Sequence, residues 1–410
     1  MTNILETQAK SILRVRRRLD SWFISRCGLN LYRGCAHACA YCDGRSENYR
    51  APEDFANTIE VKVNALAVLE RELKRLIAKN APEPQLNLFE ESSERRGQPP
   101  PSVWNAVFAH IKSKDVHKGC ARPSLASESS RTQDASSTLC RSAHSYADAS
   151  ASGEMQAPMS ASRAYCHPWP REMQPSVSAI SGFLTLGGGV SDQYQPLEGK
   201  YKLARGVLEL CLRYTIPIHI LTKSTLVLRD IDLLRAINER TKVLLSVSIS
   251  TLDPAIAAIV EPGAPPPEER LAMFEEFRAA RIACGVFLLP VLPFLSDTPA
   301  AIHESVSGCA RAGARYVLFG GLTLKAGRQT EHYLDCLTAH FPALAEKTRT
   351  LFRAANQYGI PDNPEARERW LAAQKAAAEA LQRHGLSTRI PPEIFASIVS
   401  AEDRERILRM

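Results

Sequence analysis

The sequence lacks any apolar run that approaches the roughly 20 residues needed to cross a bilayer. Residues 1–20 are polar and basic and lack the apolar centre of a signal peptide. The net charge is a mild +7 over 410 residues. Eleven cysteines in such a chain indicate free thiols in a reducing compartment rather than a disulfide framework. We therefore expect a soluble cytoplasmic protein that does not associate with membranes.

A long internal stretch lacks the periodicity of helices and strands. Residues 90–178 are rich in Ser, Ala, Pro and Arg, and only 104–111 suggests a short helix. This composition buries too little apolar surface to offset chain entropy, so it predicts a low-complexity, disordered insertion. The thiols and imidazoles of this stretch fit no metal template and are expected to be idle. They are Cys120, Cys140, Cys166, His144 and His167.

What the sequence does contain is a tight cysteine loop, Cys35-Ala-His-Ala-Cys39-Ala-Tyr-Cys42. Three thiolates at this spacing can hold three irons of a cubane iron–sulfur cluster and leave the fourth iron without a protein ligand. A zinc site needs four ligands, and His37 could be the fourth, but the second Cys-x2-Cys pair usual in such sites is absent. A redox Cys-x2-Cys would not need Cys35. The cluster is favoured, with zinc and redox chemistry as alternatives.

Strands alternate with helices on either side of the insertion, which predicts parallel βαβ units. The expected strands cover residues 21–31, 183–186, 217–221, 243–249, 284–289 and 315–319. Residues 54–59 are expected to lead into a helix with Leu66, Leu69 and Leu73 on one face. Further helices are expected over 203–214, 229–240, 267–281 and 299–312, and again within 330–410.

With Tyr41 before its last cysteine, the loop resembles the signature of radical S-adenosylmethionine (SAM) enzymes. The resemblance implies a [4Fe–4S] cluster on Cys35, Cys39 and Cys42, whose open iron chelates SAM. One electron from the cluster would cleave SAM to a 5′-deoxyadenosyl radical. A one-electron donor such as flavodoxin or ferredoxin is implied as a partner. The six strands then indicate an α/β fold, an open partial (β/α)6 barrel of the radical SAM type with a helical C-terminal extension.

Polar motifs follow the expected strands at their carboxyl ends, where parallel barrels gather their chemistry. The closer resemblance is to the spore photoproduct lyase-like branch, often labelled DNA repair photolyase, over about residues 25–80 and 180–325. It is carried by residues 30–42, 191–198, 222–224, 229–230, 248–251 and 261–262. It implies that Tyr41 lies near the adenine of SAM. The other implied SAM contacts are Gly187, Gly188, Gly189, Ser191, Asp192, Lys223 and Ser248, with Glu198 and Arg270 as further candidates.

Two positions depart from that branch. Spore photoproduct lyases carry a hydrogen-donating cysteine just before the Ser-Asp pair, where this chain has Gly189. They also carry a tyrosine after the third cluster cysteine, where this chain has Asp43. Both parts of the hydrogen-return relay are absent, so a substrate other than a thymine dimer is expected.

We expect a radical SAM enzyme acting on an unknown substrate. The arginines at 14 and 16–18 could contact the phosphates of a nucleic acid, although such runs are more often solvated faces. The expected organisation is a basic segment (1–20), a first part of the core (21–89), the insertion (90–178), the rest of the barrel (179–328) and the extension (329–410). The alternative is an iron–sulfur or zinc protein that binds nucleic acid without radical chemistry. The Lys, Ser and Gly set at the strand ends disfavours it.

Overall fold

The computed structural model describes residues 2–80, 180–188 and 190–409. The predicted insertion at 90–178, with its thiols, its imidazoles and the helix at 104–111, lies outside these residues, and so does Gly189. All described residues belong to one unit of the chain.

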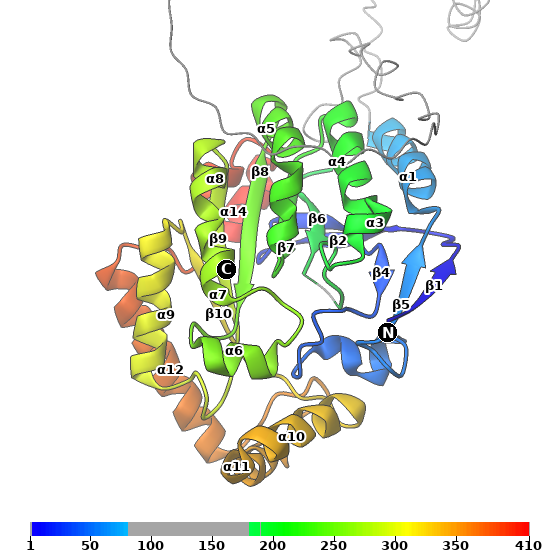
Figure 1. The fold of residues 1–410 in the computed structure, drawn as a ribbon. Coiled ribbons are helices and arrows are strands. Elements are labelled where there is room, and N and C mark those ends of the chain that lie inside the picture. The colour runs from blue at the N-terminus through cyan, green and yellow to red at the C-terminus, as the bar shows by residue number, and fades with distance from the viewer. Residues whose placement is uncertain (1, 81–179, 189, 410) are drawn as a thin grey trace, which may run out of the picture. The chain divides into compact units, whose positions relative to one another are not determined.

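An open seven-stranded sheet forms the centre of this unit (Figure 1). Its strand order is β10-β9-β8-β7-β6-β3-β2. The strands are β2 (Leu13–Asp20), β3 (Ser25–Leu29), β6 (Leu184–Gly187), β7 (Ile218–Thr222), β8 (Val243–Ile249), β9 (Ala283–Val291) and β10 (Val317–Gly321). Strand β3 and strands β6 to β10 are parallel, and β2 pairs antiparallel with β3 at one edge. The six parallel strands confirm the predicted open partial barrel.

Strand β8 shows how alternation builds the two faces of the sheet. Leu245 and Val247 belong to the main core that the sheet shares with the crossover helices. Leu244 and Ser246 point to the opposite face, since successive side chains of a strand alternate. On that face Ser246 bonds Tyr316, and C-terminal residues such as Phe395 complete the packing. The C-terminal extension therefore covers this face of the sheet.

The crossover helices follow the strands in the expected order. They are α1 (Ala65–Asn80), α3 (Glu198–Tyr201), α4 (Leu203–Tyr214), α5 (Ile231–Arg240), α6 (Pro254–Val260), α7 (Pro267–Ala272), α8 (Phe274–Ala279) and α9 (Pro299–Ala312). Helix α9 begins where Thr298 caps the amide of Ala301, and it ends at Gly313 with φ of 90°. The helix expected over 267–281 is divided at Met273 into α7 and α8.

Residues near the N-terminus form strands that the sequence analysis did not predict. A second sheet has the order β1-β5-β4, from β1 (Asn3–Thr7), β5 (Thr58–Lys62) and β4 (Tyr32–Arg33). Thus the chain enters β5, not a helix, directly after residue 57. The reason is a short period-2 pattern in which Ile59 and Val61 are buried while their neighbours are only partly so.

The C-terminal extension is helical, as predicted. It contains α10 (Arg328–His340), α11 (Pro342–Phe352), α12 (Pro364–Arg383), α13 (Pro392–Phe395) and α14 (Ala401–Arg409). Helix α12 runs beside α9 (Figure 1), and α10 contacts the segment that follows the cysteine loop. Within the described ranges, no helix has the length and apolar character needed to cross a membrane. The cytoplasmic location stays a prediction.

Candidate functional site

A cavity of about 390 Å³ opens at the carboxyl ends of the parallel strands. Most of the residues predicted from the sequence line this one cavity. They are Cys35, Cys39, Tyr41, Cys42, Gly188, Ser191, Asp192, Lys223 and Ser248. Gly187 does not line it, and Gly189 is not described. Their roles toward a cofactor stay predictions, but the fold brings together segments that are far apart in sequence.

The cysteine loop is a compact turn that starts at a glycine. Gly34 has φ of +81°, and a Cβ there would lie 2.4 Å from the carbonyl oxygen of Thr58. The amide of Ala38 donates to the Cys35 carbonyl at 3.1 Å, and the amide of Cys42 donates to the Cys39 carbonyl at 3.3 Å. These bonds hold the three thiols within one short turn.

Gly34→Ala is therefore expected to disrupt the loop. The added methyl group would clash with backbone atoms, which cannot move without disturbing the fold. In addition, the positive φ costs a non-glycine residue about 1 kcal/mol or more. We expect lower thermal stability and reduced iron content after reconstitution. Gly199→Ala in α3 is the matched control, because nothing lies within 4 Å of its Cβ position. A Gly34→Ala protein that loads iron and melts like the Gly199→Ala protein would contradict this account of the loop.

The three thiols are buried enough to resist ionisation on their own. Burial is the largest cause that raises the pKa of Cys35, and it raises the pKa of Cys39 to about 12 and that of Cys42 as well. The charge of Lys223 opposes the rise at Cys39, and Arg45 opposes it at Cys42. Binding of a metal centre must therefore displace protons, as expected for thiolate ligands. In the described residues no three His, Cys, Asp or Glu side chains converge on one ion.

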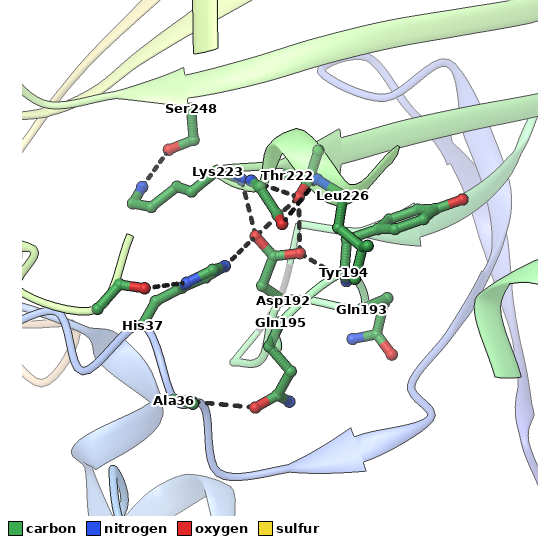
Figure 2. Close-up of polar contacts among 12 residues, drawn as sticks. Ala36, His37, Asp192, Gln193, Tyr194, Gln195, Thr222, Lys223, Leu226 and Ser248 are labelled. Atoms are coloured by element: carbon green, nitrogen blue, oxygen red, sulfur yellow. Dashed lines mark hydrogen bonds and ion pairs between the residues drawn. The ribbon is translucent and has the colours of Figure 1, made fainter. Parts of the chain in front are cut away.

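The residues after β6 clamp the cysteine loop (Figure 2). Ser191 donates from its hydroxyl to the Gly34 carbonyl at 3.0 Å. The side-chain oxygen of Gln195 accepts from the amide of Ala36 at 3.0 Å, and that of Gln193 accepts from the amide of Leu31 at 2.7 Å. Neither glutamine was predicted as a site residue, although both lie within residues 191–198, one of the segments that carry the family resemblance.

Two of the predicted glycines serve packing. A Cβ on Gly187 would lie 2.1 Å from the carbonyl oxygen of Leu221 in β7, and one on Gly188 would lie 2.4 Å from the ring of Phe23. The Phe23 ring in turn lies 5.2 Å from the ring of Phe287, and both rings line the cavity. The two glycines thus allow β7 and the rings of Phe23 and Phe287 to lie close to the cavity.

A second group of polar residues lies behind Tyr41. The Lys223 ammonium donates to the Ser248 hydroxyl at 2.5 Å, lies 5.8 Å from the centre of the Tyr41 ring and is 3.7 Å from Glu261. The Tyr41 hydroxyl donates to Glu261, and so does Ser250 at 2.8 Å. Glu261 was recognised only as part of a motif, yet it joins the cavity wall to the interior.

Two further candidates from the sequence do not line the cavity. Arg270 is 1% exposed, pairs with Glu261 and donates to the carbonyl of Ser248 at 3.0 Å. Glu198 is fully buried and accepts from Tyr32 at 2.6 Å and from Arg229 at 2.9 Å. The Arg270 guanidinium and the Glu198 carboxylate therefore already have hydrogen-bond and ion-pair partners within the protein.

The C-terminal extension holds the other side of the cysteine loop. Gln329 is fully buried, and its side-chain amide donates to the Tyr41 carbonyl at 3.0 Å and to Asp43 at 2.9 Å. Asp43 also accepts from Thr323 at 3.0 Å and pairs with Lys325 at 2.8 Å. Asp43 is thus fixed by three partners from one segment.

Gln329→Ala is expected to loosen the loop from the extension. It would leave the Tyr41 carbonyl and one Asp43 oxygen short of donors, at a cost of about 1–3 kcal/mol in unfolding free energy. We expect faster loss of iron to a chelator. Gln382→Ala, at an exposed position of α12, is the matched control. Equal chelation rates in both variants would show that the extension does not hold the loop.

Comparison with known proteins gives distant likenesses. No family model matches the chain. An uncharacterized protein of Mycobacterium tuberculosis (strain ATCC 25618 / H37Rv) is 32% identical over 216 residues, which is 52% of this chain and 62% of that protein. An uncharacterized protein of Methanocaldococcus jannaschii is 31% identical over 146 residues, or 36% of this chain and 53% of that protein. The chain therefore spans less than two thirds of the curated relatives it matches.

In fold the chain is similar to spore photoproduct lyase. A structure of that enzyme complexed with dinucleoside spore photoproduct has a TM-score of 0.49 and 12% identity, covering 93% of this chain and 79% of that one. The Streptococcus suis protein SuiB bound to S-adenosylmethionine has a TM-score of 0.27 and 14% identity, covering 39% of this chain and 35% of that one. Neither likeness assigns a reaction to this chain.

Proposed function

We propose that this chain is a radical SAM enzyme in which Cys35, Cys39 and Cys42 hold a [4Fe–4S] cluster. One observation carries the proposal: three thiols from a single short turn line a cavity that also presents an ammonium group and two serine hydroxyls. Three thiols of one loop suit a cluster with one iron left open. When bound and reduced, this cluster would supply the electron that cleaves SAM to a 5′-deoxyadenosyl radical.

The remaining polar lining suits the amino-acid part of SAM. Lys223 has three N–H donors, of which Ser248 accepts one and Glu261 lies near another, so a donor is left for a carboxylate. The Ser191 hydroxyl donates to Gly34 and that of Ser248 donates to a carbonyl, so each can only accept a further bond. An ammonium group is a donor, and hence the serines suit the SAM amino group while Lys223 suits its carboxylate.

An apolar wall of the cavity suits a reactive radical. Trp22, Phe23, Phe287 and Leu289 present aromatic and aliphatic surface to the same cavity. Such a wall excludes water from the reacting atoms and limits side reactions. Tyr41 also lines the cavity and is proposed to contact the adenine.

Substrate and electron donor are open within this proposal. A flavodoxin or ferredoxin is the kind of donor that the chemistry requires. The arginines of β2 at 14 and 16–18 are exposed, so contact with nucleic acid remains a hypothesis about the substrate. The absence of a cysteine at 189 and a tyrosine at 43 argues against thymine-dimer repair by the family's own relay.

The proposal is tested by anaerobic reconstitution. Iron and sulfide are counted, dithionite and SAM are added, and 5′-deoxyadenosine is measured by chromatography. We expect about four irons per chain and formation of 5′-deoxyadenosine that depends on dithionite. One zinc per chain, or a cluster that never cleaves SAM, would instead favour a metal-containing binding protein.

A further inference from the structure

Asp192 lies between the cysteine loop and the end of β7 (Figure 2). The Thr222 hydroxyl donates to both of its carboxylate oxygens, at 2.8 and 2.9 Å. The backbone amides of Lys223 and Tyr194 donate to it at 2.7 and 2.9 Å. On the other side, Nε2 of His37 lies 3.2 Å from Oδ2. One carboxylate therefore connects the loop, its own segment and β7.

These partners leave Asp192 little capacity for a ligand. An ionised carboxylate offers about four lone-pair positions; the Thr222 hydroxyl and two backbone amides donate to this one, and the His37 ring lies beside Oδ2. Burial alone would raise the pKa of the Asp192 carboxyl, but the hydrogen bond and charge of His37 and the amides of Lys223 and Tyr194 outweigh it and lower the pKa. Asp192 was predicted from the sequence as a SAM contact; its partners indicate that it acts through other residues.

His37 is held from both sides. Its side chain is 2% exposed, and Nδ1 lies 3.0 Å from the Gly263 carbonyl oxygen, opposite the contact with Asp192. Gly263 also donates from its amide to the His37 carbonyl at 3.0 Å, and a Cβ on Gly263 would lie 2.1 Å from the Ala36 carbonyl oxygen. Nδ1 thus has a carbonyl neighbour and Nε2 faces the Asp192 carboxylate, which accounts for a buried histidine between Cys35 and Cys39 without making it a metal ligand.

Lys223 is held through the same carboxylate. Its backbone amide donates to Asp192, and from there its side chain crosses the cavity wall to Ser248. The backbone amide of Asp192 also faces the Cys35 thiol and opposes the rise of its pKa. A shift of Asp192 would therefore displace both the thiols and the ammonium group.

We propose that His37 and Asp192 form a positioning pair that holds the cysteine loop in register with the Lys223 ammonium. Neither residue reacts. Together they fix the separation between the metal-binding turn and the group that would receive the SAM carboxylate. This inference rests on the proposed function for its ligand, but the link between the two segments is independent of any ligand. Replacing a group that orients the direct ligands of a metal site typically lowers metal affinity or activity about 10- to 100-fold.

The test compares His37→Gln, Asp192→Asn and the double variant with the wild-type protein. The matched control is Asp297→Asn, which breaks another largely buried pair, with Arg369 at 2.6 Å, outside the cavity. Iron is counted first, and SAM affinity is then measured by equilibrium dialysis of the oxidised, reconstituted full chain. We expect each single variant to bind SAM at least about tenfold more weakly, the double variant no more weakly than the weaker single, and the control to bind normally.

A second readout needs neither metal nor SAM. In the iron-free full chain, alkylation of Cys35, Cys39 and Cys42 by iodoacetamide is followed by mass spectrometry, with buried Cys211 and Cys309 as internal standards. We expect faster alkylation of the loop thiols in both single variants, no further gain in the double variant, and no change in Asp297→Asn. This readout decides the proposal even if a variant loads no iron.

The outcomes separate the two claims. If the wild-type protein does not bind SAM, the proposed function fails, while the alkylation rates still decide whether the pair holds the loop. If the wild-type protein binds SAM but the single variants bind it equally well, or their effects add fully in the double variant, the positioning pair is overturned. Alkylation rates that match the control in all variants would overturn it as well.

Discussion

Cys39→Ala is expected to abolish 5′-deoxyadenosine formation. Cys39 supplies one of three thiols from a single loop, and two thiolates from that loop cannot hold the cluster in the site-differentiated form that SAM requires. Cys39 is 7% exposed and packs in a small buried cluster with residues such as Leu292, so its truncation removes only one sulfur atom from the packing. We expect a folded protein with iron well below the wild-type content and product below detection.

The matched control is Cys309→Ala in α9. Cys309 is also buried, which raises the pKa of its thiol to about 12, but it lies in the core away from the cavity. Its removal should cost about 1 kcal/mol in unfolding free energy through lost packing and leave iron content and product formation unchanged. If Cys39→Ala cleaves SAM as well as the wild-type protein does, the loop is not the cluster site.

Glu261→Gln is expected to be the most destabilising single change near the cavity. Glu261 is 2% exposed and pairs with Arg270, itself 1% exposed, and with Lys223. Without the carboxylate, the buried guanidinium keeps its charge and loses its partner, which costs about 3–5 kcal/mol in unfolding free energy. The Lys223 ammonium would also lose a neighbour, so weaker SAM binding should accompany the loss of stability.

The stabilisation by the ionised Glu261 carboxylate should depend on pH in acid solution. Burial would raise the pKa of Glu261, but Lys223, Arg270 and the hydrogen bonds from Tyr41 and Ser250 outweigh it and lower the pKa from 4.5 to about 2. The folded-state pKa is depressed, so the stabilisation is fully present above about pH 4.5 and is lost as the pH falls toward 2.

Urea unfolding of the iron-free chain at several pH values measures this dependence. The gap in unfolding free energy between wild type and Glu261→Gln should be constant from pH 7 to about 5 and then narrow as the pH falls. Glu402→Gln, at an exposed position of α14, should differ from wild type by less than about 0.5 kcal/mol throughout. A gap that does not change down to pH 3 would mean that Glu261 is not the group that titrates.

The parts of the site that could be predicted are those that follow from local pattern. Alternation in β8 and helical spacing in α4 and α9 gave the order of strands and crossovers, and parallel strands place their carboxyl ends at one edge. That rule placed the polar motifs with Ser191, Lys223 and Ser248 at the edge of the sheet that holds the cysteine loop, and the family resemblance singled out these three residues. The strand β5 was missed because five alternating residues before a strong helix give a weak signal.

The partners of these residues could not be predicted, because they are separated along the chain. Gln329 and Asp43 are 286 positions apart, and Tyr41 and Glu261 are 220 apart. A buried glutamine and an exposed one look alike in sequence, and only packing decides which carboxylate meets which guanidinium. Arg270 was a further candidate for a SAM contact, and in the structure its guanidinium pairs with the buried Glu261.

The most direct measurement is electron paramagnetic resonance of the dithionite-reduced, reconstituted protein, recorded with and without SAM. A site-differentiated cluster on Cys35, Cys39 and Cys42 predicts a reduced [4Fe–4S] signal whose g values change when SAM binds to the open iron. The change should be absent when a sulfonium-free analogue without the amino and carboxylate groups replaces SAM. A cluster signal that SAM leaves unaltered, or no cluster signal in protein that has retained its fold, would contradict the account.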